Sequence, residues 1–399
     1  MKKKEVTKTI IPGLVHLVKD GDVVKYLLKN KDRLCIKDSI ILNDKVCTPK
    51  QDLPIKMPGP EIINESMNVN LGELLNEIIS FIKNHLEMPS ESDYLILALW
   101  VFHTYLIEKF STTPILYFYG VKETGKTRAG EVLNEISLMG ERLTAPTEAT
   151  LFRSADYFKT TLIIDEVKLW GKNGNEEVAR LIKSRYKRGI KVPRVNLNKK
   201  GENMIEYFDV FGPLVICTTE SMPDAIESRC ITFLMQKNSK VEVEKIIDIK
   251  QADELRNKLT IFKAKYLEQD LKETGQIARR RLNEIMMPLY KVLMFIAPER
   301  EEAFKKTVQE IEYAKKEDEG SSLEAEIVQA LILHKNEEIF ITRSITKELN
   351  KERIETVKLS DKKVVNIIKR LGFKKTRTAK ERGFEIELKL LEKLALQYD

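Results

Sequence analysis

The chain has 399 residues, of which 42% are hydrophobic and 32% are charged. This length predicts two or three domains, and this composition is globular, which excludes a disordered or fibrous chain. The net charge is +7, and the four cysteines lie far apart, which argues against a zinc site or a disulfide framework. No apolar stretch is long enough to span a bilayer and no apolar segment follows the basic first residues, so we expect a cytoplasmic protein without a membrane partner.

The first part of the chain alternates apolar and polar positions in short runs that are separated by polar turns. The runs at 23–27, 34–36 and 39–42 predict a small β-rich unit. A proline-rich hinge follows, and apolar residues at helical spacing then predict helices over 71–86 and 90–107. No motif in the β-rich unit indicates whether it binds nucleic acid, orders an assembly or only packs on the rest of the chain.

An apolar strand at 115–119 runs directly into a Gly-x-x-x-x-Gly-Lys-Thr motif, and a helix-prone segment follows at 127–138. This pattern indicates a phosphate-binding P-loop, because glycines let backbone N–H groups surround phosphate oxygens and a helix N-terminus favours the anion. Lys126 would reach the β- and γ-phosphates, and Thr127 would ligate Mg²⁺. The predicted phosphate-binding residues are Gly120, Val121, Lys122, Glu123, Thr124, Gly125, Lys126 and Thr127.

Further apolar strands follow near 142–143, at 161–164 and at 214–217, with helices between them. This alternation predicts a parallel α/β core. The strand at 161–164 ends in two adjacent acids. Behind a P-loop, Asp165 is expected to hold Mg²⁺, usually through water, and Glu166 to polarise the water that attacks the γ-phosphate.

Polar residues also follow the strand at 214–217, where a P-loop ATPase places a side chain that orients the attacking water. We select Thr219 for this role, with Thr218 and Glu220 as alternatives. The run Pro-Asp-Ala-Ile-Glu-Ser-Arg-Cys comes shortly after, and this arrangement resembles the AAA+ ATPases. In that family an arginine after the sensor strand points into the nucleotide of the neighbouring subunit. The resemblance implies that Arg229 is this arginine finger, and a local ion pair is the alternative.

Helical periodicity over 241–256 and 259–296 predicts a helical lid behind the core. The lid contains three consecutive arginines, and the last of them begins the pattern R-x-x-E-I-x-x-P-L. This pattern looks like the lid motif of helicase-like ATPases from phages, plasmids and other mobile elements. By that resemblance Arg281 is a second sensor arginine that reaches the γ-phosphate, with Arg280 as the second choice. Three arginines in a row are equally typical of a solvated helix face.

Eight basic residues and no acidic one lie between positions 183 and 200, which suggests a polyanionic partner. Apolar and polar positions alternate at 192–197 and 203–208 around a polar turn, which predicts a β-hairpin with a basic tip. Its position matches that of the hairpin before the sensor strand in hexameric AAA+ helicases such as MCM, where tip lysines follow DNA in a central channel. A merely solvated hairpin is the alternative. The candidates for contact with DNA phosphates are Lys199, Lys200 and Arg194.

The last part of the chain follows a polar linker at 317–322. It predicts helices at 323–334, 344–350 and 361–371 and a β-hairpin around 378–382. Three helices and a basic hairpin suggest a winged helix that binds duplex DNA, with the third helix in the major groove. The alternative is a helical module that binds protein instead. The candidates for DNA contact near the wing are Lys374, Lys375 and Arg377.

Together these features predict an α/β protein: an AAA+ P-loop parallel-sheet core with a helical lid, a small N-terminal β-rich unit and a C-terminal winged-helix domain. The expected domains are 1–60, 61–240, 241–315 and 320–399. The resemblance to MCM-like helicases of mobile elements implies ATP and Mg²⁺ as cofactors and a homo-oligomer, a hexamer, around single-stranded DNA. Two alternatives are a replication initiator or helicase loader that binds duplex DNA and uses ATP as a switch, and a regulatory ATPase. The basic hairpin favours the helicase.

Overall fold

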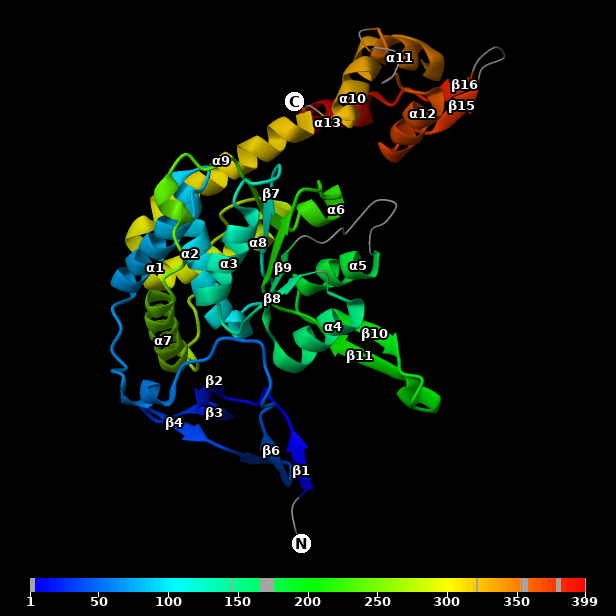
Figure 1. The fold of residues 1–399 in the computed structure, drawn as a ribbon. Coiled ribbons are helices and arrows are strands. Elements are labelled where there is room, and N and C mark those ends of the chain that lie inside the picture. Colours follow the sequence, from blue (N-terminus) through cyan, green and yellow to red (C-terminus); the bar gives the residue numbers. More distant parts are fainter. Residues whose placement is uncertain are drawn as a thin grey trace. The chain divides into compact units, whose positions relative to one another are not determined.

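The computed structural model describes residues 4–144, 146–165, 176–320, 322–351, 353, 358–377 and 382–398. The chain forms two compact units, residues 1–307 and 308–399 (Figure 1). The β-rich segment, the core and most of the predicted lid all lie in the first unit, so their division into separate domains stays a prediction. Within the described ranges, no helix has both the length and the apolar character to cross a membrane.

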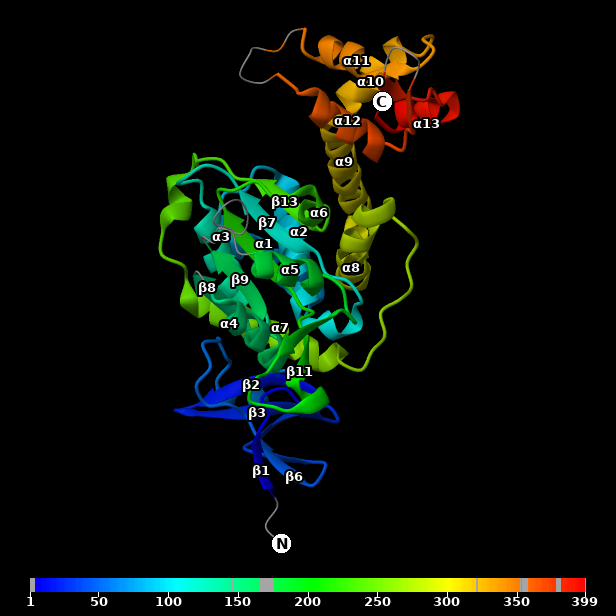
Figure 2. The same cartoon turned by 90° about the vertical axis from the view of Figure 1, so that its right-hand side faces the viewer.

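A five-stranded parallel sheet lies in the centre of the first unit (Figures 1 and 2). In chain order its strands are β7 (Ile115–Tyr119), β8 (Gly140–Thr144), β9 (Thr161–Asp165), β12 (Leu214–Thr218) and β13 (Cys230–Leu234). Their spatial order is β13-β7-β12-β9-β8. The predicted parallel α/β core is therefore confirmed. The fifth strand was not predicted, because exposed Thr232 and Leu234 interrupt its apolar pattern as in an edge strand.

Helices cover both faces of this sheet. On one face lies α3 (Lys126–Ile136), against which α1 (Leu71–His85) and α7 (Ile249–Tyr266) pack, and α2 (Glu91–Tyr105) and α8 (Arg280–Ile296) pack on each other beside them. A Cβ at Gly130 of α3 would meet Ile163 at 3.0 Å, so glycine lets this helix approach the sheet closely. On the other face, α4 (Glu148–Arg153), α5 (Glu176–Arg185) and α6 (Asp224–Glu227) supply Leu151, Leu181 and Ile226 to the core.

The predicted continuous helix over 259–296 is wrong, because α7 ends at Tyr266 and α8 begins only at Arg280. The segment between them contains Gly275, and glycine inside a helix is unfavourable. The side chain of Asn283 accepts the N–H groups of Ile277 and Ala278 at 3.1 and 3.3 Å, which fixes the turn before α8. The three arginines therefore lie at the beginning of a helix and not within one.

The predicted β-rich unit at the N-terminus is confirmed as two small sheets. One contains β2 (Leu14–Asp20), β3 (Val23–Asn30) and β4 (Arg33–Lys37), and the other contains β1 (Lys4–Thr7), β5 (Ile40–Leu42) and β6 (Lys45–Thr48). Val18, Leu27 and Leu34 form a buried cluster with Ile261 and Ala264 of α7. This cluster holds the β-rich segment on the helical part of the first unit.

The predicted β-hairpin is also present, as β10 (Lys191–Val195) and β11 (Ile205–Asp209) (Figure 1). The strands are antiparallel, with Lys191 opposite Asp209 and Val195 opposite Ile205. One face of the hairpin packs on the protein through buried Val192 and Phe208. The hairpin connects α5 to β12, which is the position that the sequence predicts.

The second unit contains α9 (Glu301–Gly320) in large part and then α10 (Leu323–Leu333), β14 (Phe340–Ile341), α11 (Thr342–Leu349), α12 (Asp361–Arg370), β15 (Lys375–Arg377), β16 (Arg382–Phe384) and α13 (Leu388–Tyr398). The three short strands form a sheet in the order β14-β16-β15 around buried Phe340 and Phe384. The three predicted helices and the hairpin strands are present. The two-residue β14 and α13 were missed, although the leucine spacing in α13 is helical.

Candidate nucleotide site

The P-loop joins β7 to α3 at the carboxyl edge of the sheet (Figure 1). Gly125, directly before α3, has φ +80°, a left-handed conformation that favours glycine. At Gly120, a Cβ would lie 2.5 Å from the carbonyl oxygen of Met235, so a larger residue does not fit there. The two glycines thus let the chain turn from strand to helix and place Lys126 and Thr127 in the first turn of α3.

The ammonium group of Lys126 is held inside the loop. Its Nζ donates to the carbonyl oxygen of Val121 and to Oγ1 of Thr124, the latter at 3.2 Å, and the residue is 9% exposed. This cation lies beside the N-terminus of α3, where the partial positive charge of a helix favours anions. The residues present therefore fit the phosphate groups of a nucleotide.

Thr127 and Asp165 meet although 38 residues separate them in the chain, since Thr127 Oγ1 donates to Asp165 Oδ1 at 3.1 Å. A hydroxyl and a carboxylate beside a phosphate site are ligand types that Mg²⁺ takes in P-loop enzymes. The other carboxylate oxygen of Asp165 lies 3.8 Å from Nη1 of Arg142, which also pairs with Glu131 at 2.7 Å. Glu166 lies outside the described residues, so its role stays a prediction.

The polar residues after β12 lie at the same edge of the sheet. Cys217 is opposite Asp165 in the strand register, and Thr218 is opposite Tyr119. Thr218 is buried, and its Oγ1 accepts the N–H of Glu220 at 3.1 Å. Thr219 is exposed and follows the strand directly. The selection of Thr219 over its neighbours stays a prediction. Burial raises the pKa of the Cys217 thiol well above its usual range, so we assign this cysteine to the core.

A cavity of about 260 Å³ adjoins the P-loop. It is lined by the end of α1, by the P-loop with Arg128, and by the segment after β13. Arg128 joins two of these walls, because its Nε donates to the carbonyl of His85 at 3.0 Å and its Nη2 to that of Val243 at 3.4 Å. Burial lowers the pKa of His85, whose Nε2 accepts the N–H of Asp248 at 3.2 Å. Sequence reasoning missed this cavity, because no motif connects its three segments.

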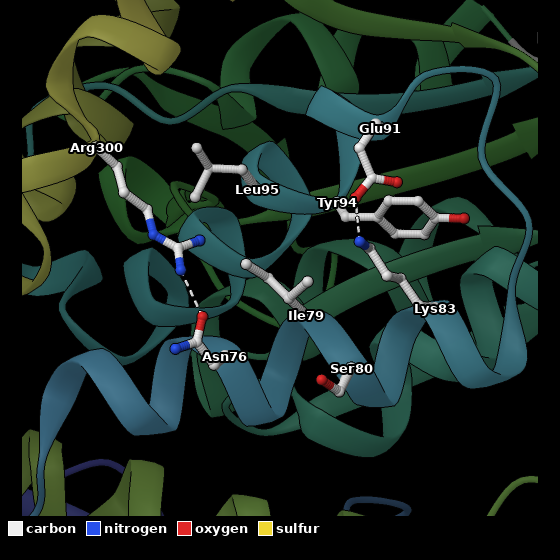
Figure 3. A pocket seen from close by; sticks show the side chains of 8 residues that line it. All are labelled: Asn76, Ile79, Ser80, Lys83, Glu91, Tyr94, Leu95 and Arg300. Carbon is white, nitrogen blue, oxygen red and sulfur yellow. Dashed lines mark hydrogen bonds and ion pairs between the residues drawn. The ribbon is translucent and has the colours of Figure 1, made fainter.

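A second cavity, of about 410 Å³, is lined by α1, α2 and Arg300 (Figure 3). At one end, Lys83 pairs with Glu91 and lies over the ring of Tyr94, 5.1 Å from its centre. At the other end, Arg300 Nη2 donates to Asn76 Oδ1 at 2.5 Å. Its charged groups thus pair with side chains of its own walls, and no P-loop residue lines it. We do not assign a nucleotide to this cavity.

Arg229 and Arg281 meet at the opposite, amino edge of the sheet. The carbonyl of Arg229 accepts the N–H of Ile115, the first residue of β7, at 3.2 Å, and the carbonyl of Tyr186 accepts that of Thr113 at 2.9 Å. The guanidinium carbons of Arg229 and Arg281 lie 4.7 and 5.2 Å from the centre of the Tyr186 ring. Arg281 Nη1 also donates to Tyr186 Oη at 2.7 Å. The structure thus brings two predicted site residues, Arg229 and Arg281, to the same tyrosine ring although 52 positions separate them in the chain.

Neither arginine lies at the P-loop of its own chain. The loop follows the last residue of β7. Arg229, and the Tyr186 that contacts both arginines, are instead hydrogen-bonded to residues at and just before the beginning of β7. Five residues at about 3.3 Å each give a strand of about 16 Å between the two edges. The sensor role of Arg281 therefore stays a prediction.

The DNA-binding candidates on the hairpin differ in their surroundings. Lys199 Nζ lies 2.6 Å from Glu206 Oε1, and this hydrogen bond raises the pKa of Lys199. The guanidinium carbon of Arg194 lies 4.1 Å from the centre of the Phe152 ring, so Arg194 packs on α4. Lys200 is exposed at the tip. Contact with DNA stays a prediction for all three.

Two basic residues of the 183–200 cluster stabilise the fold. Arg185 is fully buried and donates to the carbonyls of Val210 at 3.0 Å and Pro213 at 3.2 Å, and burial lowers its pKa to about 9. Arg188 donates to the carbonyl of Phe110 at 2.9 Å. The count of basic residues in the sequence therefore overstates the charge that this segment offers to a polyanion.

In the second unit, Lys374, Lys375 and Arg377 are exposed on and beside β15. The buried side of α12 holds the helix on the core through Val364, Ile367 and Ile368. The basic residues on its exposed side are Lys362, Lys363, Lys369 and Arg370. Both sets of charged side chains are accessible within this unit, and their contact with DNA stays a prediction.

No protein-family model matches the chain, and no curated protein matches it either. Among solved structures, the apo NrS-1 C-terminal region is similar over 93% of this chain and 95% of its own, with 13% identity and a TM-score of 0.38. A full-length MCM homologue from Methanopyrus kandleri is similar over 74% and 75%, with 10% identity and a TM-score of 0.42. An inhibitor-bound JCV helicase is similar over 59% and 65%, with 15% identity and a TM-score of 0.31. These similarities are too distant to carry a functional argument.

Proposed function

We propose that the chain is an ATPase that completes its catalytic site with arginines from a second copy of itself and uses hydrolysis to move along DNA. One observation carries this proposal. The phosphate-binding loop with the Thr127–Asp165 pair lies at one edge of the central sheet, and Arg229 with Arg281 lies at the other. Each chain thus holds two half-sites that it cannot join by itself.

At the carboxyl edge, the P-loop N–H groups and Lys126 would bind the phosphates of ATP, and Thr127 and Asp165 would hold Mg²⁺. The bound Mg²⁺ would neutralise charge on the phosphate oxygens. Glu166, assigned from the sequence alone, would take up the proton of the attacking water, and Thr219 would orient that water. The cavity beside Arg128 would receive the base and ribose, because it opens next to the phosphate loop.

At the amino edge, Arg229 and Arg281 would reach the γ-phosphate of a neighbouring chain and stabilise the charge of the transition state. A contact between two different edges of the same protein is head-to-tail, and such contacts generate a closed ring where the rotation closes. The placement of the half-sites therefore supports a homo-oligomeric ring as the proposed assembly. A hexamer is proposed from the resemblance of the motifs to those of hexameric AAA+ helicases.

The proposed action on DNA depends on the hairpin β10–β11. It emerges between α5 and β12, presents exposed Lys200 at its tip and lies beside α5, which ends at the amino edge with the arginines. Hydrolysis at a chain interface would thus be able to move a phosphate-binding tip, which is the requirement for a helicase. Assignment to a mobile element is proposed from the arginine-containing lid motif alone.

A second candidate function is a replication initiator or helicase loader. The exposed lysines of α12 and β15 favour it, because the helix–strand–helix–helix–strand–strand order from α10 to β16, with basic residues on its third helix, suits duplex DNA binding. Such a protein would bind duplex DNA and use ATP as a switch without unwinding.

Unwinding of a forked DNA substrate separates the two candidates. A helicase unwinds the fork with ATP and loses this activity in the Lys199→Ala/Lys200→Ala double variant while it still binds ATP. The matched control is Lys19→Ala/Lys37→Ala, which removes the same charge from exposed positions of the β-rich part. Duplex binding without unwinding by the unmodified chain would favour the initiator.

A further inference from the structure

We infer that Tyr186 is a positioning residue that holds Arg229 and Arg281 together for the phosphates of a second chain. This inference rests on the proposed function of the two arginines. Sequence reasoning did not select Tyr186, because nothing in the pattern around it marks a site. Only the fold brings Tyr186, after α5, into contact with Arg229, before β13, and Arg281, in α8.

Tyr186 has a fixed place in the fold. It is 5% exposed and belongs to the same buried cluster as Leu181 and Val192. Its carbonyl accepts the N–H of Thr113, and the preceding residue, Arg185, is anchored by its bonds to the carbonyls around residues 210–213. The backbone of Tyr186 is therefore fixed by its own hydrogen bond and by those of Arg185. The position of the ring does not depend on the two arginine side chains.

This fixed ring contacts both guanidinium groups. Their carbons lie 4.7 and 5.2 Å from its centre, within the range over which the face of an aromatic ring attracts a cation. The hydroxyl also accepts a hydrogen bond of 2.7 Å from Arg281. Since two like charges near one ring repel each other, both attractions are needed to keep the arginines adjacent.

Arg281 needs this support because of its position in α8. It lies in the first turn of the helix, where the helix dipole disfavours a cation. Glu284 offsets part of this cost by pairing with Arg281, and its carbonyl accepts Thr112 Oγ1 at 2.8 Å, which fastens α8 to the residues before β7. Tyr186 and Glu284 thus hold the Arg281 guanidinium at the sheet edge.

Preorganisation is what such an arrangement contributes to catalysis. An arginine side chain has several rotatable bonds, and a group that must stabilise a transition state acts best when it is already in place. The ring serves both arginines and the hydroxyl serves one. Replacing Tyr186 with phenylalanine should therefore weaken the placement of Arg281 only, and replacing it with leucine should weaken the placement of both arginines.

The first test measures ATP hydrolysis and ATP-analogue binding in Tyr186→Phe, Tyr186→Leu and Arg229→Ala. We expect kcat to fall by less than tenfold in Tyr186→Phe and by about 10²-fold in Tyr186→Leu, with KM and analogue binding unchanged. The matched control is Tyr290→Leu, because Tyr290 is similarly buried, at 6%, and its hydroxyl also donates to a charged side chain, Glu301. This control should keep its kcat. Wild-type kcat in Tyr186→Leu would overturn the inference.

The second test asks which chain of an interface needs Tyr186. Lys126→Ala chains can only donate arginines, and Arg229→Ala chains can only supply the P-loop, so a mixture of the two should recover hydrolysis. We expect Tyr186→Leu to prevent this recovery when it is added to the Lys126→Ala chain and to leave it intact on the Arg229→Ala chain. Equal loss in both arrangements would mean a general structural role and would overturn the inference. Absence of recovery in the unmodified mixture would contradict the proposed function instead.

Discussion

The two edges of the central sheet are built in different ways. The carboxyl edge is made of two short continuous segments, since the loop from Gly120 to Thr127 and the acid at the end of β9 come together through the strand order alone. The amino edge is made of side chains from three separate elements, Tyr186 after α5, Arg229 before β13 and Arg281 in α8. In the proposed function the first edge binds phosphate through its backbone, and the second edge offers two arginine side chains that contact one aromatic ring.

Because of this difference, only the arginine half of the proposed site depends on contact between chains. A phosphate loop is complete within one chain, because the backbone N–H groups and the helix N-terminus belong to the same segment. In the proposed function the arginines act on the phosphates of a neighbouring chain, because both lie at the amino edge of their own sheet. Binding and hydrolysis should therefore respond differently to changes at the two edges.

The largest expected effect is the loss of nucleotide binding in Lys126→Ala. The ammonium group lies inside the P-loop, and a hydrogen bond from a charged donor to phosphate is lost with it, so affinity should fall by about 10²-fold or more. Titration with a fluorescent ATP analogue measures this. Lys237→Ala is the matched control, because this lysine is 70% exposed by its side chain and pairs with Glu123. Equal binding by both variants would remove Lys126 from the site.

Arg229→Ala should act on hydrolysis and not on binding. A finger that stabilises the transition state contributes about 10³–10⁵ in rate in P-loop enzymes, so kcat should fall by a factor in this range. The affinity for ATP should stay unchanged, because Arg229 is tied to the other end of β7. Steady-state hydrolysis and analogue titration on the same preparation provide both values. Weakened binding with normal turnover would place Arg229 at the P-loop of its own chain.

Acid should weaken the amino edge through His103, which is fully buried and lies 2.9 Å from Thr113 Oγ1. Burial lowers its pKa from 6.5 to about 3, so below pH 6.5 the unfolded chain binds a proton that the folded chain excludes. Stability is then complete above pH 6.5 and falls as the pH decreases, by about 2 kcal/mol at pH 5. Denaturant unfolding at pH 7 and pH 5 measures the loss of unfolding free energy between the two pH values. In His103→Gln this loss should be smaller by this amount than in the unmodified chain. The same loss of stability in His103→Gln and in the unmodified chain would show that His103 is not its cause.

The smallest expected effect concerns the hairpin tip. Each phosphate contact contributes about −0.7 to the slope of log affinity against log salt for a single strand. Lys200→Ala should lower that slope by about one contact, whereas Lys199→Ala should change it less, because Lys199 first has to leave Glu206. Binding of single-stranded DNA across a salt series measures both variants. Identical slopes in the two variants and the unmodified chain would remove the tip from the DNA site.

The sequence predicted the parts of the site that lie in continuous motifs. The P-loop, Asp165 and the hairpin were found because each is a local pattern that a single strand or turn explains. The cavity beside Arg128 was not found, since its walls come from residues about 85, 125 and 240. Tyr186 was missed for the same reason, and Arg185 was counted with the DNA-binding charge although it is fully buried. The roles of these residues depend on tertiary contacts, which no local sequence pattern indicates.

The central claim, that each catalytic site is shared by two chains, is tested most directly by mixing inactive variants. Lys126→Ala and Arg229→Ala are each expected to lack hydrolysis alone. In an equal mixture, about one interface in four of a head-to-tail ring combines an intact P-loop with an intact arginine finger. The mixture should therefore recover hydrolysis up to about a quarter of the wild-type rate. A mixture no more active than its separate components, at concentrations where the chains associate, would contradict it.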